Sequence, residues 1–325
     1  MSGVEQRTVE RDEDELRLDR WLARHFPGLP FGRLQKLLRT GQVRVDGRRA
    51  RGDFRLAVGQ TVRVPPLAPE QAAGRRPTSV RPEDARWIRS LVLHEDDALI
   101  VIDKPAGLAV QGGSGTTRHL DGMLDHLAMS DVRPRLVHRL DRETSGLLVL
   151  ARSRAAAATL ATSFRRRLVE KLYWAVVVGR PARPVGRIRD PLTKGAVGQA
   201  ERVRPVPGGR EAETDYRTIQ AAGRIAAWLG LRPATGRTHQ LRAHCAGLGS
   251  PILGDGKYGG ATSRPSGAPP GLMLHAREIR LPHPDGHVLH LQAPPSPTLR
   301  AGLAWFGFEI DPTLGGASLD GFDAP

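Results

Sequence analysis

The segment from Arg135 to Ser153, RLVHRLDRETSGLLVLARS, places a dense polar cluster immediately before an aliphatic run. Within it, Asp141 lies between Arg139 and Arg142 and should stand at the entrance of a buried strand. Burying a carboxylate without a partner can destabilise a protein by about 3 to 5 kcal/mol, so Asp141 needs a cationic neighbour. A carboxylate kept ionised in this way can act as a nucleophile in covalent catalysis. The alternative is a surface ion pair, which is the common fate of an aspartate flanked by arginines.

Other polar clusters match no established site. The glycine-rich stretch QGGSGTT, residues 111–117, lacks the GK[ST] of a phosphate-binding P-loop and is more typical of a substrate loop or a turn. His239, His244 and Cys245 are close in sequence, but their spacing fits neither HExxH nor a CxxC framework. We therefore expect no bound metal and no cofactor.

The elements that must position Asp141 are short strands. The runs ALIVID, LLVLAR, LYWAVVVG, AAWLGLR and HVLHLQAP are separated by Gly/Pro turns and by helical stretches such as RAAAATLATSFRRRL. They predict a mixed α+β domain rich in sheet over residues 87–312, followed by a flexible tail over 313–325. The run Arg165 to Arg167 at the end of the predicted helix could bind phosphate or could complement the helix dipole.

A smaller domain is predicted over residues 14–66. LRLDRWLARHF and GRLQKLLRTG have the spacing of two amphipathic helices, and QVRVDGRRARGDFRLAVGQTVRVPP reads as a small hairpin-like sheet. Residues 1–13 are expected to form a disordered charged tail. Residues 67–86, which are rich in Pro, Ala and charge without periodicity, are expected to form a linker.

The charge balance indicates a polyanionic partner. Lys and Arg number 49 against 34 acidic residues, which gives a net charge of +15, and 44 of the 49 are arginines. No apolar run approaches the roughly 20 residues that cross a bilayer, and the N-terminus lacks a secretory signal. The single cysteine, Cys245, suits a reducing compartment. We expect a cytoplasmic monomer that binds nucleic acid and no membrane.

Residues 15–65 resemble the small alpha-L (S4-like) RNA-binding domain, which also occurs in a ribosomal protein of the small subunit. The stretch from residue 33 to residue 51 holds seven basic side chains, with Asp46 as its compensating acid. Such an array favours contact with phosphates, whereas the alternative is a solvated charged face. The candidate RNA-binding residues are Arg33, Lys36, Arg39, Arg48, Arg49 and Arg51.

The segment HRLDRETSG resembles the signature of the RluA-type pseudouridine synthases. The resemblance continues in order through VIDKPAGLAVQGGSG (101–115), HRLDRETSG (138–146), EKLYWAVVVG (170–179) and the run that begins RPATGRTHQLR (232–260). Together with the N-terminal domain it covers about residues 15–310, and RVPP and VQGGSGT look most like the C-type enzymes that act on large-subunit ribosomal RNA. It implies a mainly antiparallel sheet flanked by helices, and isomerisation of uridine to pseudouridine without a cofactor.

The resemblance also implies roles for residues of this chain. Asp141 matches the nucleophile of the family, and Arg242 matches the arginine that pairs with that nucleophile. Tyr173 matches the tyrosine that packs on the target base and is a candidate to assist proton removal from carbon five. Arg139 matches the residue that fills the gap left by the extruded base. The remaining candidates for the substrate pocket are His138, Thr144 and Leu241.

Two alternatives remain open at the level of sequence. A non-catalytic RNA-binding ribosome-assembly factor would need the basic charge and the alpha-L domain, but not the set formed by Asp141, Tyr173 and Arg242. A pseudouridine synthase that acts on transfer RNA or on another RNA would keep the chemistry and change the substrate.

Overall fold

The computed structural model of the chain describes residues 4–26, 29, 31–67, 82–112, 118–129, 132–197, 200–205, 208–311 and 313–323. The chain divides into two compact units, Met1–Val80 and Arg81–Pro325, and each is described by itself below. Within the described part of the chain, no helix combines the length and the apolar character needed to cross a bilayer.

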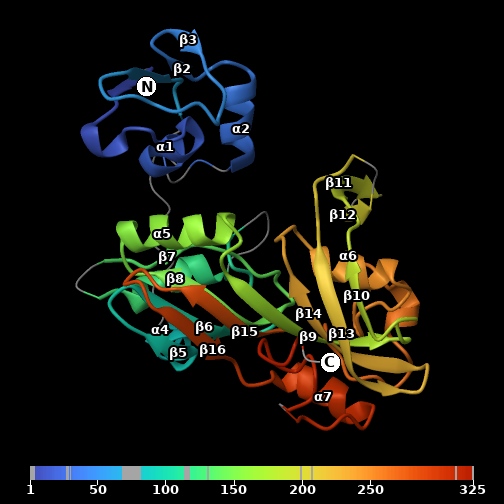
Figure 1. The fold of residues 1–325 in the computed structure, drawn as a ribbon. Helices are drawn as coiled ribbons and strands as arrows, with labels where there is room; N and C mark the ends of the chain where they lie inside the picture. Colours follow the sequence, from blue (N-terminus) through green and yellow to red (C-terminus); the bar gives the residue numbers. More distant parts are fainter. Residues whose placement is uncertain are drawn as a thin grey trace. The chain divides into compact units, whose positions relative to one another are not determined.

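The N-terminal unit packs two helices, α1 (Leu18–His25) and α2 (Phe31–Arg39), against a small sheet (Figure 1). Its core contains Trp21 and Leu22 of α1 and Leu34 of α2, as the helical spacing predicts. The described strands form one antiparallel sheet in the order β1, β4, β2, β3, with the bounds β1 Glu5–Thr8, β2 Arg44–Val45, β3 Arg48–Arg49 and β4 Thr61–Val64.

The prediction of a disordered tail over residues 1–13 is wrong for residues 4–13, which the structure describes. Strand β1 pairs with β4, Val9 is buried, and the 3₁₀ turn η1 (Arg11–Glu13) follows. Glu13 is 1% exposed, and its carboxylate accepts hydrogen bonds from Trp21 Nε1 at 2.8 Å and from the Glu10 N–H at 3.1 Å. An edge strand needs only backbone partners, so its polar sequence carried no apolar signal.

The C-terminal unit is built on one large sheet, in which the strand order along the main path is β10, β13, β14, β9, β15, β8, β6, β5. Strand β16 adds to β15, and β7 adds to β8. The strands of this sheet are β5 Val92–Glu95, β6 Leu99–Lys104, β7 Arg135–Leu136, β8 Ser145–Ala151, β9 Glu170–Val178, β10 Val185–Ile188, β13 Thr214–Ala222, β14 Ala226–Pro233, β15 Leu274–Pro282 and β16 Val288–Gln292.

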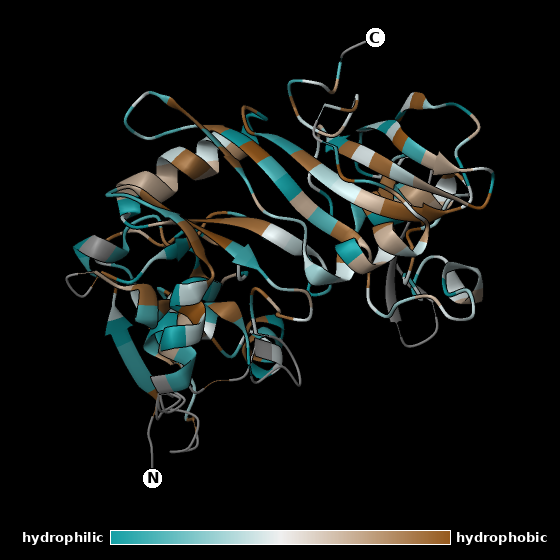
Figure 2. Cartoon of the chain, turned by 90° about the horizontal axis from the view of Figure 1, so that it is seen from below, coloured by the Kyte–Doolittle hydropathy of each residue, from teal (hydrophilic) through white to brown (hydrophobic). Residues whose placement is uncertain are grey.

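Among the described strands of this sheet, the recorded pairings are antiparallel except that of β8 with β15. The predicted class, α+β with a mixed and mainly antiparallel sheet behind a small α+β domain, is therefore confirmed. Strands β11 (Leu192–Val197) and β12 (Ala200–Pro205) form a separate hairpin that extends away from the large sheet (Figure 1). The long strands carry hydrophobic stretches interrupted by hydrophilic residues (Figure 2).

Helices and 3₁₀ turns cover this sheet. Helix α5 contributes Ala156 and Leu160 to a core with β6, β8 and β15, and η2 packs with α4 in a second core. The bounds of these elements, with α6 and α7, are α4 Pro82–Ser90, η2 Leu120–Leu127, α5 Arg154–Arg165, α6 Gln240–Gly247, η3 Gly260–Ser263 and α7 Pro297–Trp305. Helix α4 begins inside the predicted linker over 67–86, and residues 68–81 of that linker lie outside the described residues.

The parallel junction of β8 and β15 depends on Gly146. The backbone of this residue has φ +105°, which L side chains rarely adopt. A Cβ built at this position would lie 2.2 Å from the Ala276 carbonyl oxygen, opposite in the parallel register. The last residue of the HRLDRETSG segment is therefore a glycine because the backbones of two neighbouring strands approach each other there.

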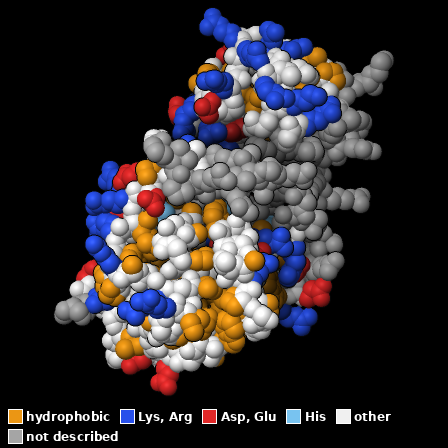
Figure 3. Space-filling model, turned by 90° about the vertical axis from the view of Figure 1, so that its right-hand side faces the viewer, with side chains coloured by type: hydrophobic (Ala, Val, Ile, Leu, Met, Phe, Trp, Pro, Cys, Tyr) orange, Lys and Arg blue, Asp and Glu red, His pale blue; other side chains and the backbone are white. Residues whose placement is uncertain are grey.

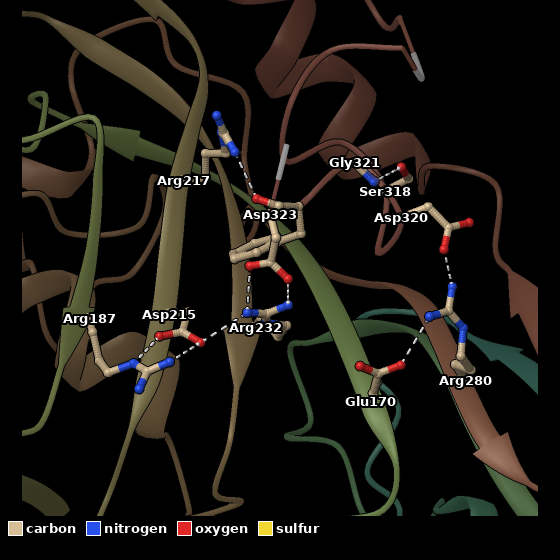
Figure 4. A network of polar contacts seen from close by, with 11 residues as sticks. Glu170, Arg187, Asp215, Arg217, Arg232, Arg280, Ser318, Asp320, Gly321 and Asp323 are labelled. Atoms are coloured by element: carbon tan, nitrogen blue, oxygen red, sulfur yellow. Dashed lines mark hydrogen bonds and ion pairs between the residues drawn. The ribbon is translucent and has the colours of Figure 1, made fainter. Parts of the chain in front are cut away.

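The predicted flexible tail over 313–325 is wrong for its described part, residues 313–323. Leu319 and Phe322 are buried in the largest core, and the Ala317 carbonyl accepts a hydrogen bond from Trp174 Nε1 at 3.0 Å. Ion pairs then fix the segment to the sheet, with Asp323 bound by Arg232 at 2.6 Å (Figure 4). The apolar residues of this segment are too few and too widely spaced to show a period in the sequence.

Candidate active site

A pocket of about 510 Å³ opens in the C-terminal unit. Its walls come from the loop before β8, the end of α5, strand β9, and the loop between β14 and α6. Residues separated by about a hundred positions in sequence therefore meet around one space. The candidate catalytic and substrate residues of this unit all line it: His138, Arg139, Asp141, Thr144, Tyr173, Leu241 and Arg242.

Asp141 stands on a tight turn at the pocket wall. The turn is closed by a hydrogen bond from the Thr144 N–H to the Asp141 carbonyl at 3.1 Å, and Leu140 anchors it in the core. The Asp141 side chain is 18% exposed, so its carboxylate can be reached from the pocket without being fully solvated. Thr144, which closes the turn, is itself buried.

Lys104 holds this turn and was not singled out from the sequence. It is fully buried at the end of β6, and its ammonium donates to the carbonyl oxygens of Pro105 at 2.8 Å, Leu108 at 2.9 Å and Arg142 at 3.1 Å. Burial lowers the pKa of Lys104 to about 8, although the charges of Glu143 and Asp141 oppose the shift. The residue next to Asp141 is thus tied to the loop that follows β6.

Hydrogen bonds between the two loops reinforce this link. The Gly107 N–H donates to the Arg142 carbonyl at 2.9 Å, and Arg142 Nε donates to the Gly107 carbonyl at 3.0 Å. A sequence signal for Lys104 existed in LIVIDKPAG, where a lysine ends an apolar strand directly before a proline. A charge in that position must be satisfied by buried acceptors.

His138 orders the start of the same loop. Its Nε2 accepts a hydrogen bond from the Val149 N–H at 2.8 Å, and its ring stacks on Phe164 with 4.5 Å between the ring centroids. Burial and the nearby charge of Lys171 lower the pKa of His138 to about 3, so the imidazole is neutral. Arg139, the next residue, is exposed where it lines the pocket.

Tyr173 lies across the pocket on β9, between strands β14 and β15. Its backbone is opposite Leu231 on one side and Ala276 on the other, which fixes the direction of the ring. Burial, together with the negative charge of Asp141, raises the pKa of Tyr173 above its usual value. The side chain is therefore a neutral phenol, suited to packing and to donating a hydrogen bond.

The predicted ion pair between Arg242 and Asp141 is wrong for this structure. Arg242 instead makes a bidentate pair with Asp255, with Nε to Oδ2 at 2.8 Å and Nη2 to Oδ1 at 2.7 Å. Burial disfavours the guanidinium charge, but Asp255 and the more distant Asp141 together raise the pKa of Arg242. Asp255 also accepts from the N–H groups of Lys257 and Tyr258, so Arg242 is held rigidly beside the pocket.

His239 lies beside the Asp141 carboxylate, with its Nε2 3.9 Å from Asp141 Oδ2. His239 has a left-handed backbone at the N-cap of α6, and its Nδ1 is 2.9 Å from the Tyr258 hydroxyl. Burial lowers the pKa of His239, and Asp141 opposes that shift. In the sequence, His239 was considered only as a metal ligand, and that role was rejected. Its position beside Asp141 was not predicted.

Basic side chains dominate the pocket. Asp141 is the acid among the described residues that line it. Against it stand six lysine or arginine side chains, which make the pocket suitable for a polyanion. These are Arg139, Arg165, Arg167, Lys171, Arg237 and Arg242.

Comparisons with known proteins match both units. Residues 98–247 match the family model described as RNA pseudouridylate synthase, and residues 16–62 match the S4 domain. The chain is 35% identical over 286 residues to ribosomal large subunit pseudouridine synthase C of Vibrio vulnificus, covering 85% of this chain and 88% of that protein. The chain belongs to the RNA pseudouridine synthase family. Both resemblances noted in the sequence, to this family and to the S4-like domain, are thereby confirmed.

Further relatives of this pseudouridine synthase come from other lineages. It is 35% identical to the mitochondrial RNA pseudouridine synthase 4 of Arabidopsis thaliana, covering 94% of this chain and 76% of that protein. Among solved structures, human RNA pseudouridylate synthase domain containing 4 matches with a TM-score of 0.58 at 28% identity, over 70% of this chain and 96% of that one. These matches show an RNA pseudouridine synthase rather than a non-catalytic assembly factor.

Proposed function

We propose that this pseudouridine synthase isomerises uridines in large-subunit ribosomal RNA and that Asp141 is its nucleophile. The observation that carries the proposal is the partly buried Asp141 carboxylate, which faces the same pocket as Tyr173 among six basic side chains. Relatives from Vibrio vulnificus, Pasteurella multocida and Escherichia coli are named ribosomal large subunit pseudouridine synthase C, which supports this substrate.

The reaction would conserve every atom of the substrate. The Asp141 carboxylate forms a bond to the uridine, at the anomeric carbon or on the ring, and the bond from nitrogen one to the ribose breaks. The uracil turns within the pocket, and carbon five bonds to the same ribose carbon. Carbon five then loses its proton and nitrogen one gains one, while the carboxylate is released.

The surrounding side chains would hold the base during this turn. Tyr173 packs on the uracil as a neutral phenol. Because its raised pKa keeps the hydroxyl protonated, Tyr173 is better suited to this packing role than to accepting a proton. Arg139 is exposed on the lining and would enter the gap that the extruded base leaves in the RNA. Arg242, held by Asp255, would supply positive charge near the carboxylate.

The N-terminal unit would dock on folded RNA. All six predicted RNA-binding residues are exposed, and Arg49 Nη2 donates to the Arg39 carbonyl, so the basic side chains of α2 and β3 are neighbours. Lysine and arginine side chains are spread over the face of this unit that Figure 3 shows. Such a surface positions RNA through its phosphates without reading the sequence.

The test is reverse-transcription mapping of carbodiimide-treated ribosomal RNA from cells that lack the protein. The cells are complemented with the unchanged protein, with Asp141→Asn, or with Asp125→Asn as a control, because Asp125 is 62% exposed and does not line the pocket. We expect large-subunit stops that return with the unchanged protein and the control, and stay absent with Asp141→Asn.

Other outcomes would change the proposal in defined ways. If no ribosomal stop depends on the protein, transfer RNA is mapped in the same way, and protein-dependent stops there would move the substrate and keep the chemistry. Stops that return with Asp141→Asn would refute Asp141 as the nucleophile. A gel-shift measurement of RNA binding by Asp141→Asn separates the two causes of inactivity, since loss of chemistry alone leaves RNA affinity intact.

A further inference from the structure

Three arginines line the pocket without a part in the proposed chemistry. Arg165 and Arg167 come from the end of α5, and Arg237 comes from the loop between β14 and α6. All three are exposed, so they stand where RNA would enter. The sequence left open whether the run at the helix end binds phosphate or complements the helix dipole.

The backbone at Arg167 is unusual. The Leu168 N–H donates to the Ser163 carbonyl at 3.0 Å, and the Arg167 N–H donates to the Phe164 carbonyl at 3.2 Å. This is a Schellman ending of α5, in which the residue after the cap adopts a left-handed backbone and is usually glycine. Here it is Arg167, with φ +60°. An arginine in a strained position that glycine would satisfy points to a role for its side chain.

In the protein without RNA, the Arg167 side chain forms an ion pair with Glu211. Arg167 Nη2 lies 3.0 Å from Glu211 Oε2, and Arg237 Nε donates to the Glu211 carbonyl oxygen at 2.9 Å. The Glu211 and Arg167 side chains are 63% and 48% exposed, so the ion pair is solvated and weak. A single acidic residue thus links arginines from two elements of the pocket lining.

We propose that Arg167 and Arg237 form a binding site for a phosphodiester of the target RNA strand, next to the extruded uridine, and that this phosphate displaces the Glu211 carboxylate from Arg167. The inference rests on the proposed function, because it takes the pocket as the place of the extruded base. A phosphate presents oxygens to a guanidinium in the same bidentate geometry as a carboxylate.

Replacing the Glu211 carboxylate by an RNA phosphate is favourable because breaking the exposed Arg167–Glu211 ion pair costs little free energy. The Glu211 pair is exposed, while the RNA phosphate arrives together with the base that fills the pocket and gains from release of its counterions. Arg165, whose Nη2 binds Thr162 Oγ1 at 2.9 Å, adds positive charge to the same rim. The Glu211 carboxylate would keep Arg167 from binding other anions until a target strand enters.

The test compares Arg167→Gly, Glu211→Gln and the control Arg224→Gln in the full-length protein. Arg224 is exposed in the turn before β14, whereas the pocket residue Pro233 lies at the other end of that strand. RNA affinity is measured by filter binding to an unmodified transcript of large-subunit ribosomal RNA over a series of salt concentrations. Melting temperature and pseudouridine formation at saturating RNA are measured in parallel.

We expect Arg167→Gly to weaken RNA binding about tenfold and to reduce the slope of log affinity against log salt by about 0.7 to 0.9, the value for one lost phosphate contact. Its melting temperature should stay unchanged or rise by about 2 °C, since glycine relieves the left-handed backbone. Glu211→Gln should tighten binding about two- to fivefold because the competing carboxylate is gone.

Equal affinity and equal salt slope for Arg167→Gly and Arg224→Gln would overturn the inference. If Arg167→Gly lowers the melting temperature, Glu211→Gln decides: tighter RNA binding supports the displaced carboxylate, and unchanged binding refutes it. Failure of the proposed function is distinguishable, because then the unchanged protein forms no pseudouridine in the transcript, whatever the variants do to affinity.

Discussion

Replacing Gly146 with alanine should destabilise the C-terminal unit and disorder the active-site turn. A Cβ at this position would meet the Ala276 carbonyl oxygen at 2.2 Å and the Ala276 amide nitrogen at 2.7 Å, both backbone atoms that cannot rotate away. Strands β8 and β15 would have to separate by about 0.8 Å before the first contact reached 3.0 Å, a distance that real Cβ atoms almost never go below.

Two costs add in this variant. The backbone at φ +105° costs about 1 to 2 kcal/mol for a residue with a Cβ, and forcing extra atoms into a packed contact costs about 1 to 3 kcal/mol. We therefore expect Gly146→Ala to lower the free energy of unfolding by about 2 to 5 kcal/mol. Pseudouridine formation should fall as well, because the turn that carries Asp141 runs directly into this junction.

Gly286→Ala is the matched control. Gly286 has φ +96° in the turn before β16, and a Cβ there would meet nothing within 4 Å. It should therefore lose only the backbone term, about 1 to 2 kcal/mol. Urea unfolding followed by tryptophan fluorescence gives both values. Equal losses for the two variants would show that the close approach of β8 and β15 does not constrain residue 146, and would refute the reasoning.

Three further outcomes are expected. Lys104→Met should slow pseudouridine formation, since it frees the turn beside Asp141. The lowered pKa of Lys104, about 8 against an ordinary 10.5, means that the unfolded chain binds more protons between these values; the unchanged protein should gain stability relative to this variant as pH rises from 8 to 10.5, which urea titrations at each pH would check. Asp255→Asn should destabilise by about 3 kcal/mol in calorimetry by leaving the buried Arg242 charge without its carboxylate, whereas a loss within measurement error would contradict a buried pair. Deleting residues 313–325 should lower the melting temperature by several degrees and expose apolar surface to a fluorescent dye, and an unchanged melting curve would mean that the segment does not pack in solution.

The sequence predicted elements whose signal is local. The apolar runs of β6, β8, β9 and β14 became buried strands, and the helical spacing placed Trp21 and Leu34 in the N-terminal core. The polar residues of the motif before β8 line the pocket, and the family resemblance was what predicted this role for them.

The hydrogen-bond and ion-pair partners of the polar residues could not be predicted from the sequence. Arg242 pairs with Asp255, thirteen residues further on, because a planar carboxylate fits a guanidinium bidentately and both side chains are buried. Lys104 donates a hydrogen bond to the Arg142 carbonyl, and a backbone acceptor of this kind cannot be recognised from the residue types in the sequence. In the same way, β1 is stabilised by backbone bonds along a polar stretch, and only the fold shows them.

The position of β15 has a consequence for how the enzyme is made. This strand inserts between β8, which follows the Asp141 turn, and β9, which carries Tyr173, although it begins more than a hundred residues after β8 ends. Contacts of such sequence separation form slowly, because the intervening loop must be closed first. The two walls of the pocket are thus joined by a strand that leaves the ribosome after both of them, so a nascent chain that ends before residue 274 cannot yet hold Asp141 and Tyr173 in their final relation.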